Sequence, residues 1–116
     1  MELTCICFND SEKPVHLDNE DWIKVGHTYI VIGLKVGTGD KIGIKLKNFK
    51  ENLYFSIERF YFNSLNVSEL IHRLENSPVQ GLKLGTVINQ QIYVAESMEA
   101  MIPYIKTDDN RSIADL

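Results

Sequence analysis

The chain has 116 residues, of which 44% are hydrophobic and 24% are charged, and its formal net charge is −4. This length accommodates one modest hydrophobic core, and the composition is that of a globular protein rather than a disordered one. The apolar run from Tyr29 to Ile32 is far shorter than the roughly 20 residues that span a bilayer. The N-terminus has no basic and apolar leader pattern and cysteines are few, so we expect a reduced, cytoplasmic protein.

The charges are unevenly distributed along the chain. Residues 1–21 carry six acidic residues and one lysine, whereas residues 22–62 carry seven basic residues and three acidic ones. A basic middle segment indicates either a partner-binding face or solvated lysines that keep strand edges from aggregating. Solvated lysines are the commoner origin of such a pattern.

Two stretches early in the chain have the patterns of strands. Residues 3–8 alternate between two faces, with Leu3, Cys5 and Cys7 on one of them, which predicts a first strand. Residues 28–32 are all β-branched or aromatic, so both faces of a strand formed by them would be apolar. Because such a strand is typical of the centre of a sheet, we expect residues 28–32 to form the central strand.

A third strand is predicted after a glycine-rich connection. Glycines at positions 33, 37 and 39 favour a hairpin turn within residues 33–41. The apolar residues at 42, 44 and 46 then alternate with Gly43, Lys45 and Lys47, which predicts a half-exposed strand with one largely basic face. Residues 53–62 are expected to form a second part of the core, because they include Tyr54, Phe55, Phe60, Tyr61 and Phe62.

The second half of the chain begins with a predicted helix. Asn66 and Glu69 have the spacing of a capping box, and the apolar residues at 67, 70, 71 and 74 have helical periodicity. Together they predict an amphipathic helix from Val67 to about Glu75. Pro78 is expected to stop it.

The remaining residues are predicted to form a hairpin, a short helix and a tail. Residues 82–88 and 92–95 have the composition of two strands of a β-hairpin. Ser97 is expected to cap a short helix with Met98, Met101 and Ile102 on one side, which Pro103 interrupts. Residues 107–116 are polar and acidic, so we expect a flexible tail.

Residues 22–60 contain a G-x-x-Y-x-V strand (Gly26 to Val31), a glycine-rich hairpin and a closing F-x-x-x-R-F segment (Phe55 to Phe60). This arrangement resembles small SH3-like barrels, in particular short uncharacterised bacterial and phage proteins. Together with the helix, hairpin and tail predicted above, which lie outside the resemblance, this gives an α+β, mainly antiparallel β fold: an SH3-like small barrel (1–62), an added helix and β-hairpin (63–106), and a flexible tail (107–116). The resemblance implies the barrel. It also implies a single 3₁₀ turn over Ser56–Arg59, with Phe60 in the core. The pattern contains no catalytic residues, and a fold alone does not determine function.

Candidate catalytic and metal-binding groups are few. Cys5 and Cys7 would share one strand face, where they could bind a metal together with His16 or His27, or serve as two small buried residues. Zinc sites are usually built on C-x₂₋₄-C knuckles, so we favour the second interpretation. The chain has no nucleophile elbow and no phosphate loop. We therefore expect no enzyme, no metal and no cofactor.

The function that we expect is binding to another protein, as an accessory, immunity-type or phage-associated factor. The expected contact face is basic and aromatic and consists of Trp22, Lys45, Lys47, Tyr54 and Tyr61. Nucleic-acid binding through the same face is the alternative: Lys41, Lys45 and Lys47 would share one side of a strand, with Lys35 and Lys50 nearby to follow a phosphate backbone and Tyr54 and Tyr61 to stack on bases. The negative net charge and the lack of arginine in the patch count against it. Homodimerisation through the strand edge at 82–95 is a further possibility, and we expect no membrane association.

Overall fold

The computed structural model describes residues 2–76 and 90–107. The strands are β1 (Leu3–Cys7), β2 (Thr28–Val36), β3 (Ile42–Leu46), β4 (Phe55–Ser56), β5 (Phe60–Phe62) and β6 (Tyr93–Val94). The α-helices are α1 (Ser64–Glu75) and α3 (Met98–Met101), and the 3₁₀ helices are η1 (Asn19–Asp21), η2 (Thr38–Asp40), η3 (Ile57–Arg59) and η4 (Ile102–Tyr104). The predicted tail from 108 onwards and the predicted strand at 82–88 lie outside the described residues.

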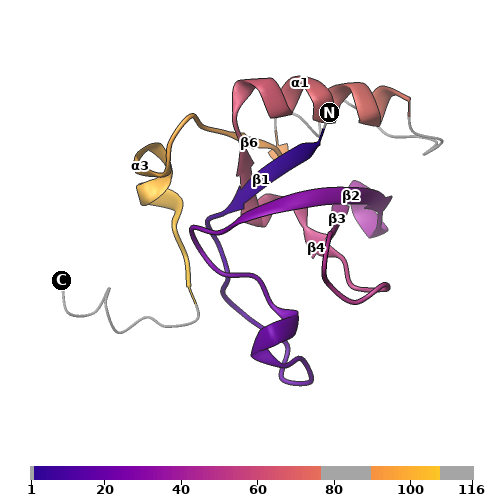
Figure 1. Ribbon diagram of the computed structural model, residues 1–116, viewed down its shortest axis with the longest axis vertical. Coiled ribbons are helices and arrows are strands. Elements are labelled where there is room, and N and C mark those ends of the chain that lie inside the picture. The colour runs from indigo at the N-terminus through magenta and orange to yellow at the C-terminus, as the bar shows by residue number, and fades with distance from the viewer. Residues whose placement is uncertain (1, 77–89, 108–116) are drawn as a thin grey trace.

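The six strands form one sheet in the order β4-β3-β2-β1-β5-β6. All neighbours are antiparallel except β5 and β6, which are parallel, so the predicted α+β, mainly antiparallel class is confirmed. The central position of β2, between β1 and β3, is also confirmed. In the part of the chain that the structure describes, no pairing joins the two ends of this order, so the sheet is open. Figure 1 shows α1 lying across one end of the sheet and α3 beside it.

A β-bulge interrupts the pairing of β2 with β3. Val31 pairs with Leu46 and Gly33 with Lys45, so Ile32 is an extra residue without a direct opposite. Ile32 is 53% exposed, so the apolar composition of both faces of residues 28–32 does not make both faces buried. The strand continues through Gly33 to Val36, and the predicted turn is confined to the residues around η2. There Gly39 has φ 70°, a left-handed conformation that favours glycine.

The main hydrophobic core confirms the predicted alternation of β1 and β3. Leu3, Cys5 and Cys7 are buried on β1, and the apolar residues of β3 are buried on the side opposite Gly43 and Lys45. The cluster also takes in Leu70 and Leu74 of α1 and Ile92 before β6, so these described parts of the second half share this core. Its buried members are Leu3, Cys5, Cys7, Ile23, Val31, Ile42, Ile44, Leu46, Phe55, Ile57, Phe60, Phe62, Leu70, Leu74 and Ile92.

The connection from β4 to β5 follows the predicted pattern. Phe55–Ser56 is followed by the 3₁₀ turn η3, and the Ser56 side chain accepts a hydrogen bond from the backbone N–H of Glu58. Phe60, directly after the turn, is fully buried. Both the 3₁₀ turn and the core position of Phe60 are therefore confirmed.

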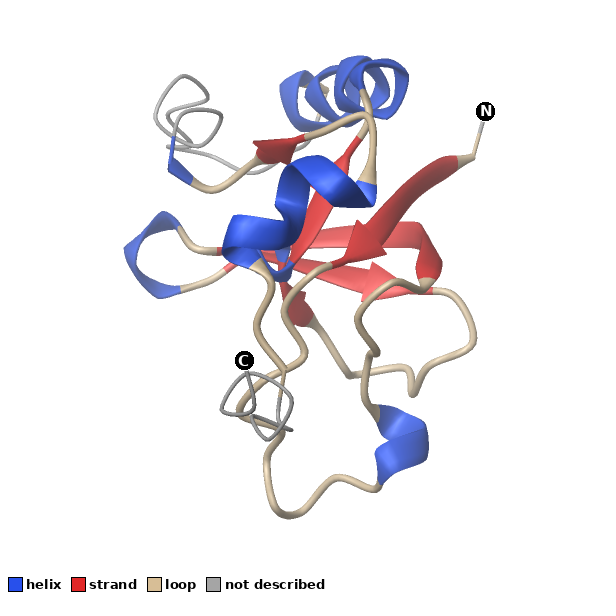
Figure 2. Cartoon of the chain, turned by 90° about the vertical axis from the view of Figure 1, so that its left-hand side faces the viewer, coloured by secondary structure: helices blue, strands red, loops and turns tan. Residues whose placement is uncertain are grey.

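A second, smaller core lies between the sheet and α3. Its buried members are Phe8, Tyr61, Ala95 and Met101, and Figure 2 shows α3 in front of the strands. The short helix after Ser97 and its end before Pro103 are confirmed, but the Ser97 side chain makes no capping hydrogen bond. Ile102 is exposed instead of packed, because the chain has already entered η4 at that residue.

The helix α1 begins one turn earlier than predicted. Its N-cap is Asn63, whose Oδ1 accepts hydrogen bonds from the backbone N–H and from the Nδ2 of Asn66, each at 2.9 Å. Asn66 is therefore not the cap, and Glu69 pairs with Arg73 on the next turn at 3.0 Å. Leu65, the apolar residue of the extra turn, is exposed and does not extend the apolar periodicity of residues 67, 70, 71 and 74, so the pattern did not reveal this turn.

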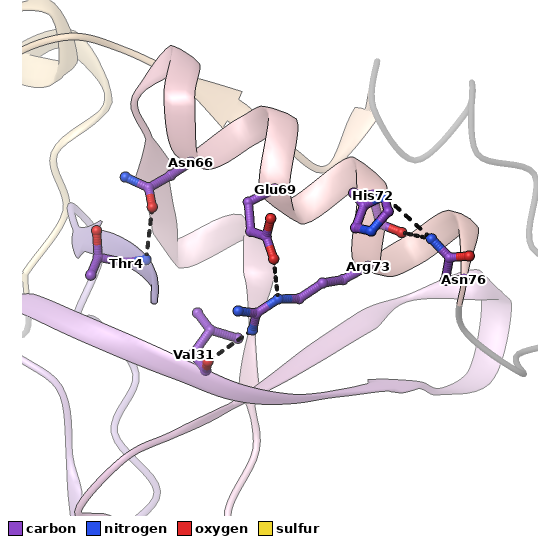
Figure 3. Close-up of polar contacts among 7 residues, drawn as sticks. All are labelled: Thr4, Val31, Asn66, Glu69, His72, Arg73 and Asn76. Carbon is purple, nitrogen blue, oxygen red and sulfur yellow. Dashed lines mark hydrogen bonds and ion pairs between the residues drawn. The ribbon is translucent and has the colours of Figure 1, made fainter. Parts of the chain in front are cut away.

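Polar side chains of α1 tie the helix to the sheet (Figure 3). The buried Asn66 accepts a hydrogen bond through Oδ1 from the backbone N–H of Thr4 at 3.0 Å. Arg73 donates through Nη1 to the carbonyl oxygen of Val31 at 3.3 Å, next to the β-bulge. Two irregular positions of the sheet, the end of β1 and the bulge of β2, thus receive their hydrogen-bond partners from one helix.

The last described segment crosses several parts of the sheet. The Gln91 side chain accepts a buried hydrogen bond from the backbone N–H of Ile42 at 2.9 Å, and β6 then pairs with β5. Further on, Lys106 donates its backbone N–H to the carbonyl oxygen of Phe8, and its own carbonyl accepts from the N–H of Asp10. The described part of the predicted hairpin therefore pairs with β5, and the strand order places β6 at an edge of the sheet.

Candidate functional site

Three lysines and one tyrosine gather on the outer side of β2, β3 and β4. We call Lys35, Lys41, Lys45 and Tyr54 the basic face. In the β2–β3 register Lys35 lies opposite Gly43, and Lys45 lies opposite Gly33. Ile44 pairs with Phe55, so continuing that register by one residue brings Tyr54 next to Lys45. Each lysine of the two strands therefore has a glycine beside it rather than another side chain.

Gly43 allows Lys35 to reach across β3. Strands lie roughly 4.8 Å apart, so Lys35 on β2 is two strand spacings from β4. Its Nζ nevertheless lies 5.4 Å from the centre of the Tyr54 ring, within range of a cation–π interaction. A Cβ atom on Gly43 would lie only 3.3 Å from the Cβ of Tyr54, so a side chain there would compete for this space.

A shallow open depression of about 390 Å³ lies at this face. Lys35, Lys41 and Tyr54 contribute to its lining, together with Gly43, Ser56 and other neighbours. Lys41 forms an exposed ion pair with Glu58 at 3.4 Å, and an exposed pair of this kind is easily opened. Tyr54 is 38% exposed. The depression thus offers two ammonium groups and an accessible aromatic ring to a partner.

Two of the predicted contact residues, Lys45 and Tyr54, share this face, but Lys47 lies elsewhere. Lys47 is exposed one residue beyond the end of β3, and its backbone N–H donates to Ile30 at 2.9 Å. It lines a separate depression of about 300 Å³, which also includes Tyr29 and Phe49.

Trp22 is half-buried and holds the loop that precedes β2. Its Nε1 donates to the carbonyl oxygen of Asp10 at 2.6 Å, and its ring lies 5.5 Å from that of Phe55. The Arg59 guanidinium covers the ring at 5.0 Å and also donates to the carbonyl oxygen of Ser11 at 2.6 Å. The indole is therefore engaged on several sides within the chain itself.

Tyr61 was expected on the contact face, and the structure shows that this is wrong. It is only 3% exposed and lies on β5 in the second core, with Phe8 nearby. Burial raises the pKa of its hydroxyl. Strand β5 is buried on both faces because α3 packs over the side that would otherwise be solvated. Sequence alternation does not reveal such a second cover.

Gly43 is a site residue that was not predicted, and Lys35 and Lys41 lie outside the five predicted contact residues and are predicted only for the nucleic-acid alternative. The only signal in the sequence was the interleaving of lysine and glycine in residues 33–45. That signal acquires meaning only when the register across the two strands is known.

The cysteine and histidine groups have no reactive arrangement at this face. Cys5 and Cys7 are buried free thiols, and burial raises the pKa of Cys7 to about 12 and that of Cys5 as well. His27 is exposed in the turn before β2, with its ring 6.4 Å from that of Tyr29. Among residues 2–76 and 90–107, no three His, Cys, Asp or Glu side chains are placed to hold one metal ion.

No protein-family model, curated protein or solved structure matches this chain. Within the described ranges, none of the helices has the length and apolar character needed to cross a membrane. The assignment of function therefore depends on the chain's own residues.

Proposed function

We propose that this protein is a non-enzymatic binding module whose basic face binds an acidic segment of another protein. The observation that carries this proposal is that Lys35, Lys41 and the accessible Tyr54 ring line one depression beside Gly43, with the Lys35 ammonium group over the ring. Complementary charge steers a partner to such a face and fixes its orientation. An exposed aromatic ring adds apolar contact area, and tyrosine is enriched at protein interfaces.

We infer that β1 to β5 together with η3 form an SH3-like small barrel that is open in its hydrogen bonding. The order β4-β3-β2-β1-β5 and the 3₁₀ turn between β4 and β5 support this inference. The contact of the Phe55 and Phe60 rings across that turn, 6.5 Å apart, supports it too. This architecture occurs with many functions, so the basic face, and not the fold, carries the functional proposal.

Nucleic-acid binding is the second candidate, and the exposed Tyr54 among lysines is what favours it. Arginine is the usual reader of phosphates and base edges. Both arginines in the described residues make contacts within the chain: Arg59 with Ser11 and Trp22, and Arg73 with Glu69. A protein partner is therefore the better match to a face composed of lysines.

The test is affinity capture from a lysate of the source cells, with and without nuclease. A Lys35→Glu/Lys45→Glu variant is expected to lose the partners that the wild type captures. The matched control, Lys24→Glu/Lys106→Glu, has the same net charge and leaves the basic face intact, so it is expected to keep them.

Three outcomes decide between the candidates. Partners that survive nuclease and depend on Lys35 and Lys45 support protein binding. Partners that disappear with nuclease and show a steep salt dependence support nucleic-acid binding. Equal capture by both variants contradicts any role for the basic face.

A further inference from the structure

Strand β4 lies at one edge of the sheet. Phe55 and Ser56 pair with β3 on one side, and in the described residues the strand order ends there. An edge strand presents backbone N–H and C=O groups that can pair with an added strand.

Two lysines from other parts of the sheet extend toward this edge. Lys35 belongs to the interior strand β2, yet its ammonium group lies over the ring of Tyr54, directly before β4. Lys41 precedes β3, and its ammonium group reaches Glu58, two residues after β4. The Lys35 ammonium group therefore lies at one end of a strand that has no charged residue of its own, and the exposed Lys41–Glu58 ion pair lies at the other end.

These lysines differ from the ones that usually protect edges. A protective lysine belongs to the edge strand and disfavours pairing by charge repulsion or burial of its own side chain. Here the edge residues are Phe55, which faces the core, and the small, exposed Ser56. Among the described strands none but β3 pairs with β4, and the Lys35 ammonium group beside this edge would attract an acidic strand.

We propose that the partner is an extended acidic segment that pairs with the edge of β4 and places a carboxylate between Lys35 and Lys41. This inference rests on the proposed function and specifies the shape of the partner. Because β4 has only two residues, backbone pairing is limited to one or two hydrogen bonds. The depression of about 390 Å³ is at the small end of ligand pockets and suits a few side chains of a peptide.

The experiment is an NMR titration of the ¹⁵N-labelled full chain with an acetylated and amidated peptide of sequence TVEVEVT. Two matched peptides accompany it, one with glutamine in place of glutamate and one with N-methyl groups on the backbone nitrogens of one strand edge. The expected result is that the amide signals of Phe55 and Ser56 shift most with the glutamate peptide. N-methylation should weaken binding by about 2- to 12-fold for each hydrogen bond lost.

Lysine variants locate the carboxylate. Lys35→Gln is expected to weaken binding of the glutamate peptide and to leave binding of the glutamine peptide unchanged. The distant Lys106→Gln is expected to change the affinity for neither peptide. If the wild-type protein binds the glutamate and glutamine peptides with equal affinity, the placement of the carboxylate is overturned.

The outcomes separate this inference from the proposed function. Binding at the basic face that is insensitive to N-methylation overturns strand addition and leaves protein binding intact. A response at this edge to single-stranded oligothymidine, with none to the glutamate peptide, overturns both. Shifts confined to residues away from β4 overturn strand addition as well.

Discussion

Replacing Asn66 with leucine would test how α1 completes the edge of β1. The β1–β5 register pairs Ile6 with Tyr61, so two residues further Thr4 would face residue 63. At residue 63 the chain has already turned into α1, and no strand carbonyl is available there. The Asn66 side chain supplies the acceptor instead, at 3.0 Å from the Thr4 nitrogen. Leucine has a similar size but no acceptor, so the Thr4 N–H would be left without a partner.

The loss of unfolding free energy expected for Asn66→Leu follows from these contacts. A buried donor left unsatisfied costs about 1–3 kcal/mol, and the partial burial of this hydrogen bond favours the lower half of that range. The better helix propensity of leucine offsets at most about 0.7 kcal/mol. The net loss should be about 1 kcal/mol, which corresponds to a decrease of roughly 3–6 °C in Tm for a domain of this size.

Chemical denaturation and hydrogen exchange would measure this effect. Asn66→Leu should lower the unfolding free energy and specifically speed exchange of the Thr4 amide. Ser68→Leu is the control, because Ser68 is exposed on the same helix, and its effect should stay within about 0.5 kcal/mol. Wild-type stability of Asn66→Leu together with unchanged protection of Thr4 would refute the reasoning.

Two further predictions concern the core and the loop that Trp22 holds. Above pH 9 the unfolding free energy should fall by up to about 1.4 kcal/mol per pH unit for each buried thiol, because Cys5 and Cys7 stay protonated in the fold and ionise once unfolded. Urea unfolding at pH 8 to 10 would show this, and a Cys5→Ala/Cys7→Ala variant with the same pH dependence would contradict it. Arg59→Lys should cost about 1–2 kcal/mol and change the fluorescence of the single tryptophan, because an ammonium group cannot both cover Trp22 and reach the same carbonyls. An unchanged emission spectrum and unfolding midpoint would count against this role of Arg59.

Much of the fold was predictable because its signals are local. The alternation in β1 and β3 encodes directly which side chains enter the core, and the aromatic and β-branched run of β2 marks the centre of the sheet. The 3₁₀ turn of η3 and the buried Phe60 also follow from a short contiguous segment. Each of these features depends on residues that are neighbours in sequence.

The features that were not predicted depend on pairing between distant segments. Tyr61 is buried because α3 covers β5. Strand β6 pairs with β5 although α1 lies between them in the sequence. Lys35 reaches Tyr54 only because the register places Gly43 between them. The N-cap position of Asn63 was missed for a different reason: two asparagines three residues apart are equally good caps, and burial of Asn66 decides between them.

The hydrogen bonds between Lys106 and residues 8–10 also bear on how the protein is made. During synthesis Phe8 leaves the ribosome early, but α3 and Lys106, which cover that region, are among the last described parts to emerge. Contacts between such distant positions form slowly, because a long loop must close first. A nascent chain would therefore expose the apolar residues of the second core until residue 106 has emerged, and exposed apolar surface of this kind favours aggregation.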